Sequence, residues 1–307
     1  MSTNDSGTGW VDPNQSAATD PSTSRVLIMS AVALTFVVLL ALVGVVLAKR
    51  AGLFGGDADG PQVGLIAANV VGEHPFMPSA VVSPVEVADT VAGDIASFRT
   101  QLPRSADRGA RLVQGTQAGL YGGTEQVSVC DVPAVANYLD AHPERSAPWA
   151  QAIGIAAQKI PYYLNTLTPV VLTVDTWVTS FFFVEGRAES AQAVLQTGNA
   201  VLIDQVGVPR VHCATGAPLT PPANVDLSTL TIEGEAWPDF APQNVVAVAY
   251  AGSGANHPVL SEFKLRDLTT GEAITRPAGG TIAIGPDPSG WTPDPAAMNV
   301  PPREGMN

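Results

Sequence analysis

Lysine is scarce in this sequence, with only three among 307 residues. From residue 51 onward, 25 acidic residues stand against 12 lysines and arginines, so this part of the chain carries a formal charge of −13. A surface with so few cations cannot neutralise a phosphate backbone. We therefore expect no nucleic-acid partner.

Histidine and recognisable catalytic motifs are also sparse. The four histidines, His74, His142, His212 and His257, never fall at the H-x-x-x-H or H-E-x-x-H spacing that places two ligands on one helical face. The sequence has no G-x-S-x-G nucleophile motif and no phosphate-binding loop with its lysine. We predict no metal site, no cofactor and no catalytic residue.

Cys130 and Cys213 are the only cysteines and lie 83 residues apart, each beside a predicted secondary-structure element. In an oxidising compartment they would form a disulfide, and closing so long a loop would stabilise the fold by about 4 kcal/mol. The alternative is a pair of buried thiols.

One long apolar run begins at Val26 and ends at Ala48 without a charge. A helix of that length spans roughly 34 Å, enough to cross a hydrocarbon layer of about 30 Å. A cleaved signal peptide has a shorter apolar stretch and a basic start, whereas three aspartates and one arginine precede this run. Although V-L-A at its end could pass as a cleavage site, we predict a permanent transmembrane helix.

The orientation of this helix rests on conflicting signals. Arg25 precedes it, and Lys49 with Arg50 follows it, which slightly favours placing the C-terminal part inside. The low cysteine count, the acidic lysine-poor composition and the short polar N-terminal tail favour the opposite. We predict a plasma-membrane protein with one span and its C-terminal domain outside.

Composition divides the chain into six segments. The chain beyond residue 50 is rich in proline and glycine, so it should contain many turns and few long helices. We expect a disordered tail at 1–25, the membrane helix at 26–48, a flexible glycine-rich stalk at 49–62, a core domain at 63–222, a β-rich part at 223–290 and a disordered tail at 291–307.

Helix and strand signals predict an α+β fold. Asp131 is a favourable N-cap for a helix that stops before Pro143, which suits the first turn of a second helix. A third short helix should bend or begin near Pro161, and 85–102 has helical spacing. Most of the remainder favours strands. We expect a small helical patch packed on a mainly antiparallel β domain, preceded by the one transmembrane helix.

Two carboxylates and one aromatic cluster are candidates for function. Asp175 and Asp204 each adjoin a predicted strand and could in principle form an acid–base pair, although aspartate more often caps a turn. Trp177 and the phenylalanines at 181–183 form the most apolar cluster outside the membrane run, which suits a core or a partner surface. Tyr121 lies in a glycine-rich L-Y-G-G-T turn.

Several of these stretches together resemble an uncharacterised domain family of actinobacterial membrane-anchored proteins. The likeness covers roughly 63–222, with a weaker echo to about 290. The matching stretches are E-H-P-F-M-P-S at 73–79, G-L-Y-G-G-T at 119–124, C-D at 130–131, L-T-P-V at 167–170, D-T-W-V-T at 175–179, A-V-L-Q at 193–196 and G-V-P-R-V at 207–211.

The resemblance implies a single-pass anchor, a domain outside the membrane, and no assigned activity or cofactor. The family's final motif often reads C-x-C-G-N-P-L, whereas this chain has C-A-T-G-A-P-L at 213–219. One cysteine and one asparagine are missing, which leaves Cys130 and Cys213 as the only possible pair and puts in doubt any metal or redox role of the fuller motif.

These observations favour a non-enzymatic domain that binds or assembles an envelope protein or a small ligand. The expected binding surface comprises Tyr121, Asp175, Trp177, Asp204 and Arg210. Two alternatives stay open, namely an envelope hydrolase that uses the aspartate pair and an extracytoplasmic sensor domain.

Overall fold

The computed structural model describes residues 61–102, 106–125, 127–249 and 258–298. Its α-helices are α2 (Asp89–Gln101), α3 (Val132–Ala141), α4 (Pro143–Ala152), α5 (Ile160–Leu164) and α6 (Pro295–Met298). Its strands are β1 (Gln62–Ile66), β2 (Ala106–Asp107), β3 (Ala110–Val113), β4 (Tyr121–Gly123), β5 (Thr168–Leu172), β6 (Thr176–Val184), β7 (Arg187–Leu195), β8 (Ala200–Ile203), β9 (Pro209–His212), β10 (Ala217–Thr220), β11 (Thr231–Glu233), β12 (Val246–Val248), β13 (Glu262–Asp267) and β14 (Ala273–Pro277).

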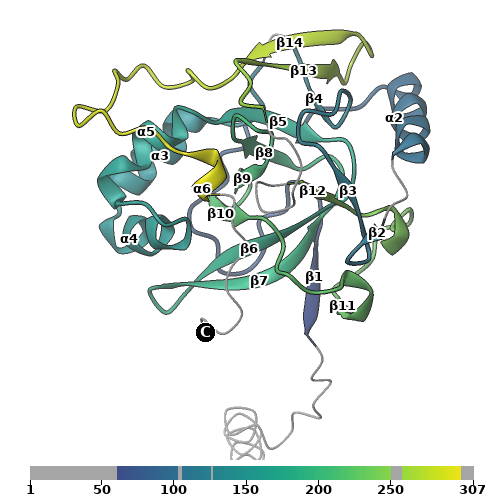
Figure 1. Cartoon of the computed structure of the whole chain (residues 1–307), viewed down its shortest axis with the longest axis horizontal. Coiled ribbons are helices and arrows are strands. Elements are labelled where there is room, and N and C mark those ends of the chain that lie inside the picture. The colour runs from purple at the N-terminus through teal and green to yellow at the C-terminus, as the bar shows by residue number, and fades with distance from the viewer. Residues whose placement is uncertain (1–60, 103–105, 126, 250–257, 299–307) are drawn as a thin grey trace, which may run out of the picture. The chain divides into compact units, whose positions relative to one another are not determined.

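The strands join into one 14-stranded sheet (Figure 1). Its main path runs β11-β1-β7-β6-β10-β9-β8-β5-β4-β13-β14, and β12, β3 and β2 branch from β6. Eight of the thirteen strand pairings are antiparallel. The prediction of an α+β domain with a mainly antiparallel sheet is confirmed for the described residues.

The branch at β6 follows from the length of this strand. β6 and β7 form a nine-pair hairpin closed by Glu185 and Gly186, both with positive φ. β6 also pairs with β12 near Trp177 and with β10 near Ser180. One long strand therefore holds two shorter strands in addition to its hairpin partner.

The helices α3, α4 and α5 gather to one side of the sheet in Figure 1. As predicted, Asp131 caps α3, because its Oδ1 accepts a hydrogen bond from the Ala134 N–H at 2.9 Å. Pro143 begins α4, as predicted, since the missing N–H of proline has no partner in a first turn anyway. The helix expected over 85–102 is α2.

These helices bury their apolar side against the sheet. Leu139 of α3, Trp149 of α4 and Leu164 of α5 share one core cluster with Leu202 of β8 and Val211 of β9. Two further clusters fill the rest of the sheet, one around β5 and β8 and one around β1 and β12. The helical patch thus covers part of the sheet, with α4 lying against β7 and β10.

A disulfide joins the helical patch to the sheet. Cys130, just before α3, is bonded to Cys213, just after β9, with their Cα atoms 5.9 Å apart. Both cysteines are buried. The expected pairing is confirmed, and the alternative of two buried thiols is not what the structure contains.

Residues 223–290, which the sequence separates from the core at 222, supply strands to the same sheet. β11 pairs with β1, β12 pairs with β3 and β6, and β13 pairs with β4. For residues 291–298 the structure also differs from the expected disordered tail. Trp291 and Met298 pack against the first core cluster, and α6 ends at Met298.

The predicted membrane helix at 26–48 lies outside the described residues, as do the tail at 1–25 and most of the stalk. Within 61–298, leaving aside the three short gaps, no helix is both long enough and apolar enough to cross a membrane.

Candidate functional site

The five residues of the expected binding surface are all buried. Tyr121, Trp177 and Arg210 are at most 2% exposed, Asp204 is 4% exposed and Asp175 is 7% exposed. They do not form an open surface, so that expectation needs correction. The reason is that Tyr121, Trp177 and Arg210 lie where strands β4, β6 and β9 are buried on both faces, a feature that a local sequence pattern does not reveal.

Asp175 is used structurally. Its Oδ1 accepts hydrogen bonds from the N–H and hydroxyl of Thr197, at 2.8 and 3.0 Å, and its Oδ2 accepts one from Trp237 Nε1 at 3.1 Å. Trp177, two residues later, lies in the core cluster around β1 and β12, with the Arg108 guanidinium 5.9 Å from its ring centroid. Asp175 thus ties the β7–β8 turn and the Trp237 loop to the start of β6.

Asp204 organises the tight turn between β8 and β9. Its Oδ1 accepts hydrogen bonds from the N–H groups of Val206 and Val208, at 3.1 and 2.9 Å. Gly207 completes the turn with a φ of 82°. Asp175 and Asp204 thus each accept hydrogen bonds from the backbone of a different turn.

Arg210 is the most deeply buried charge in the described part of the chain. It lies on β9, its Nε donates to the Tyr163 hydroxyl at 2.7 Å, and its Nη1 donates to the Met298 carbonyl oxygen at 3.1 Å. A buried guanidinium must satisfy its donors, so these contacts fix both partners in place.

Tyr121, Tyr163, Asp204 and Arg210 form one buried polar cluster. Burial raises the pKa of Tyr121 well above its usual value, and the charge of Asp204 raises it further. Burial also raises the pKa of Tyr163, with Arg210 opposing and Asp204 adding to that effect. Both phenols therefore stay protonated at neutral pH. The structure brings three of the five predicted residues together here and leaves Asp175 and Trp177 apart.

Local structure explains why Tyr163 reaches this cluster. Pro161 occupies the first turn of α5, which begins at Ile160, so Tyr163 lies within this short helix. The Tyr163 ring packs edge-on against Trp149 of α4, with centroids 6.2 Å apart, and Trp149 Nε1 donates to the Gly216 carbonyl at 2.8 Å. The helical patch thereby holds the phenol over β9.

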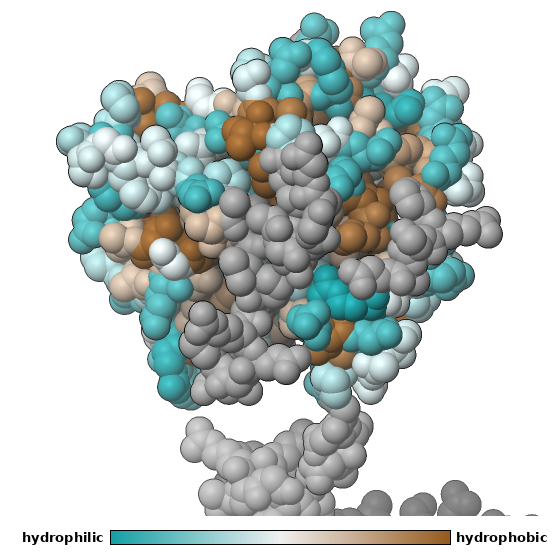
Figure 2. Space-filling view, viewed as in Figure 1, coloured by the Kyte–Doolittle hydropathy of each residue, from teal (hydrophilic) through white to brown (hydrophobic). Residues whose placement is uncertain are grey.

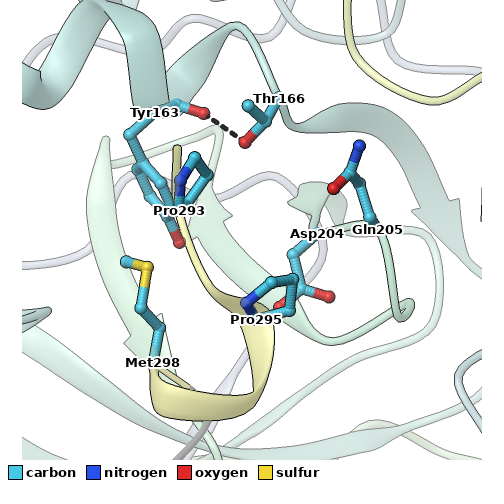
Figure 3. A pocket seen from close by; sticks show the side chains of 7 residues that line it. All are labelled: Tyr163, Thr166, Asp204, Gln205, Pro293, Pro295 and Met298. Carbon is cyan, nitrogen blue, oxygen red and sulfur yellow. Dashed lines mark hydrogen bonds between the residues drawn. The ribbon is translucent and has the colours of Figure 1, made fainter. Parts of the chain in front are cut away.

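A small pocket opens beside this cluster (Figure 3). It has about 10 Å³ of free space, which suits roughly one water molecule. Figure 3 shows side chains of α5, of the loop after β8 and of the segment ending in α6 pointing toward one another. Its lining residues are Tyr163, Thr166, Asp204, Gln205, Pro293, Pro295 and Met298.

Larger open hollows lie nearby on the surface. One of about 230 Å³ runs between α5 and residues 284–293, and one of about 340 Å³ lies between α3, α4 and the start of α5. On the face shown in Figure 2, hydrophobic residues occur as separate patches among polar ones. The hollow beside α5 adjoins the Arg210 cluster and shares Thr166 and Pro293 with its pocket.

A second buried polar network surrounds His212 at the end of β9. Its Nε2 lies 2.9 Å from Asn199 Oδ1, and its Nδ1 lies 3.0 Å from Thr215 Oγ1. Burial lowers the pKa of His212 to about 4, so the ring is neutral at pH 7. In the ranges that the structure describes, no three His, Cys, Asp or Glu side chains are grouped to hold a metal ion.

Sequence reasoning did not single out Tyr163, Lys159 or Met298. The hydroxyl and the carbonyl that Arg210 contacts come from positions 47 residues before it and 88 residues after it. Rarity was the one available signal, because Lys159 is one of only three lysines in an acidic chain.

A protein-family model matches residues 111–279, more than half of the chain. It describes a domain of unknown function, DUF6777. The chain belongs to this family. The resemblance to an uncharacterised family is thereby confirmed at that level. No curated protein and no solved structure matches the chain. The DUF6777 region contains Tyr163, Asp204 and Arg210, whereas the covering segment that ends at Met298 lies beyond it.

Proposed function

We propose that this DUF6777 protein is a single-pass membrane protein whose domain lies outside the membrane and binds an envelope component without chemical turnover. The apolar run at 26–48 supplies the anchor. The resemblance noted in the sequence adds an actinobacterial cell envelope as the setting.

The Cys130–Cys213 disulfide is the observation that best supports a location of the domain outside the membrane. Structural disulfides persist in oxidising compartments and are rare in the cytosol. This bond joins two buried cysteines at the centre of the core, where the helical patch meets β9. It therefore supports an extracytoplasmic domain over the reverse orientation that Lys49 and Arg50 would favour.

The use of the polar side chains supports binding over catalysis. Asp175 and Asp204, which the hydrolase alternative requires, accept hydrogen bonds from backbone N–H groups of the β7–β8 and β8–β9 turns. Beside the Arg210 cluster, the open hollow of about 230 Å³ shares Thr166 and Pro293 with the small pocket, which supports the binding of a ligand at this place.

Reporter cysteines test the orientation. Ser190→Cys would place a thiol on the exposed part of β7, and Ser16→Cys would place one before the membrane run. Intact cells expressing either variant would be treated with a membrane-impermeant maleimide and the protein analysed by mass. We expect S190C to react in intact cells and S16C to react only after lysis.

The reverse labelling pattern would place the domain inside and overturn the proposal. Turnover of a glycan, ester or peptide substrate by the purified protein, abolished by one point substitution, would overturn its non-enzymatic part. A variant at Asp175 or Asp204 with lost turnover would restore the hydrolase alternative.

A further inference from the structure

Residues 286–298, here called the cover, lie over the Arg210 cluster and outside the matched family region. The family match ends at residue 279, and the chain then forms a long loop that returns as α6 over the strands β8 to β10 (Figure 1). The pocket thus belongs to the family domain, whereas three of its lining residues, Pro293, Pro295 and Met298, belong to the cover.

Lys159 holds the first part of this cover. Its ammonium group pairs with Asp287 Oδ2 at 2.6 Å, donates to Ser289 Oγ at 2.7 Å, and lies 6.0 Å from the centroid of the Trp291 ring. The bond to Lys159 lowers the pKa of Asp287 to about 2, so the carboxylate is charged at neutral pH. The Lys159 ammonium group therefore contacts an acidic residue, a hydroxyl group and an aromatic ring that lie within five positions of one another in the sequence.

Arg210 holds the last part of the cover through a main-chain atom. Its Nη1 donates to the carbonyl oxygen of Met298, a group that every peptide possesses. Charge-assisted hydrogen bonds of this kind are stronger than neutral ones. The hydrogen bond to Arg210 requires only a backbone carbonyl, whereas the Met298 side chain adds packing against the first core cluster.

The cover does not fill the space around it. A hollow of about 230 Å³ lies along residues 284–293 and the side of α5, and the smaller pocket remains beneath the prolines (Figure 3). Prolines at 286, 288, 293 and 295 each fix the backbone φ angle at about −65° and so restrict the conformations of the free segment. A restricted peptide loses less conformational entropy on binding.

We infer that the surface of Lys159, Tyr163 and Arg210 that residues 286–298 cover, here called the groove, is a binding site for a proline-containing peptide with an acidic residue, and that residues 286–298 are its resident ligand. The acidic residue pairs with Lys159, the prolines cover the pocket, and a backbone carbonyl eleven positions later meets Arg210. A partner segment of the same chemistry would take this groove by displacing the chain's own residues. This inference rests on the proposed binding function and names the class of its ligand.

An exchange experiment with the full chain tests this site. A protease recognition sequence inserted beside the exposed Ala283 would allow the purified, detergent-solubilised protein to be cleaved while both pieces remain present. A fluorescein-labelled synthetic peptide of residues 286–298 would then be added and its anisotropy followed. We expect saturable binding, with release of the cleaved segment.

Two lysine variants locate the binding. Lys159→Gln removes the cation that pairs with Asp287. We expect this variant to bind the peptide with roughly tenfold lower affinity. Lys264→Gln is the matched control, because Lys264 pairs with Glu262 on the exposed face of β13. It should leave the affinity unchanged. A peptide carrying Asp287→Asn should bind the parent protein as weakly as the parent peptide binds K159Q.

Two results would overturn the inference. The first is a cleaved protein that neither releases its segment nor binds the labelled peptide, which would make residues 286–298 a permanent part of the fold. The second is binding that K159Q and K264Q affect equally, which would place the peptide elsewhere. Both results are independent of the maleimide labelling, so failure of this site and failure of the proposed location remain distinguishable.

Discussion

The Tyr121 hydroxyl donates a buried hydrogen bond to the carbonyl oxygen of Gly207, 86 residues further along the chain. The same turn carries Asp204, whose charge helps to keep Tyr121 protonated and therefore able to donate. β4 and the β8–β9 turn are thus held together by a single phenol beside the candidate site.

Removing this phenol oxygen should destabilise the fold. Tyr121→Phe keeps the ring but leaves the Gly207 carbonyl without this donor, and we expect the free energy of unfolding to fall by about 1 to 3 kcal/mol. Chemical denaturation followed by tryptophan fluorescence measures the change. Tyr162→Phe, at the half-buried neighbour of Tyr163, is the control and should shift stability by less than about 0.5 kcal/mol. Equal effects of the two variants would contradict the structural role of Tyr121.

A methyl group at Gly207 should cost more than one at another glycine with the same backbone angle. Gly207 and Gly186 have φ values of 82° and 81°, so alanine is strained at both, by about 1 to 2 kcal/mol. At Gly207 the new Cβ would also collide with the backbone of Gly115, whereas at Gly186 it meets open space. We expect Gly207→Ala to cost at least about 2 kcal/mol more than Gly186→Ala in the free energy of unfolding. Similar costs for the two variants would mean that the turn at Gly207 does not contact the backbone of Gly115.

Acid should destabilise the protein through His212 before it does so through carboxylates. The unfolded chain binds a proton on this ring below about pH 6.5, whereas the folded chain binds it only near pH 4. Stability is therefore complete above pH 6.5 and is lost as the pH falls from there toward 4. Between pH 7 and 5 we expect a loss of about 2 kcal/mol in the free energy of unfolding.

Substitution of His212 should remove this pH dependence. His212→Gln keeps a polar group between Asn199 and Thr215 but cannot titrate, so its unfolding free energy should be flat between pH 7 and 5. His74→Asn at an exposed position with φ of 54° is the control and should retain the slope of the parent. A parent and an H212Q variant with identical slopes would refute the assignment.

Loss of the disulfide should lower the unfolding free energy by about 4 kcal/mol in the chain-entropy model, because the bond closes a loop across 83 positions. Cys130→Ala with Cys213→Ala removes it without leaving a free thiol. Denaturation of this variant beside the oxidised and reduced parent measures the effect. A reduced parent as stable as the oxidised one would contradict the prediction.

Short-range physics made several parts of the fold predictable. Asp131 and Pro143 mark helix starts because capping and first-turn geometry depend on a few neighbouring residues. The cysteine pairing followed from the presence of only two cysteines.

The candidate site was predictable only in part. Asp204 and Arg210 were singled out, but their burial depends on helices and strands distant in the sequence. Tyr163 and Met298 complete the cluster through contacts 47 and 88 residues away, for which no local pattern exists. The expectation of an unstructured segment after residue 290 likewise rested on proline content, whereas Trp291 and Met298 gain order from packing against the core.

The position of β1 has a mechanical consequence. β1 runs parallel to both of its neighbours, β7 and β11, and is the first strand after residue 60. Tension carried along the chain from that side enters the described fold through β1, pulling it along its own axis. Because the hydrogen bonds to its neighbours lie across that axis, such a pull strains two rows of bonds together instead of unzipping them singly. Strand β1 is therefore well placed to resist a force applied along the chain.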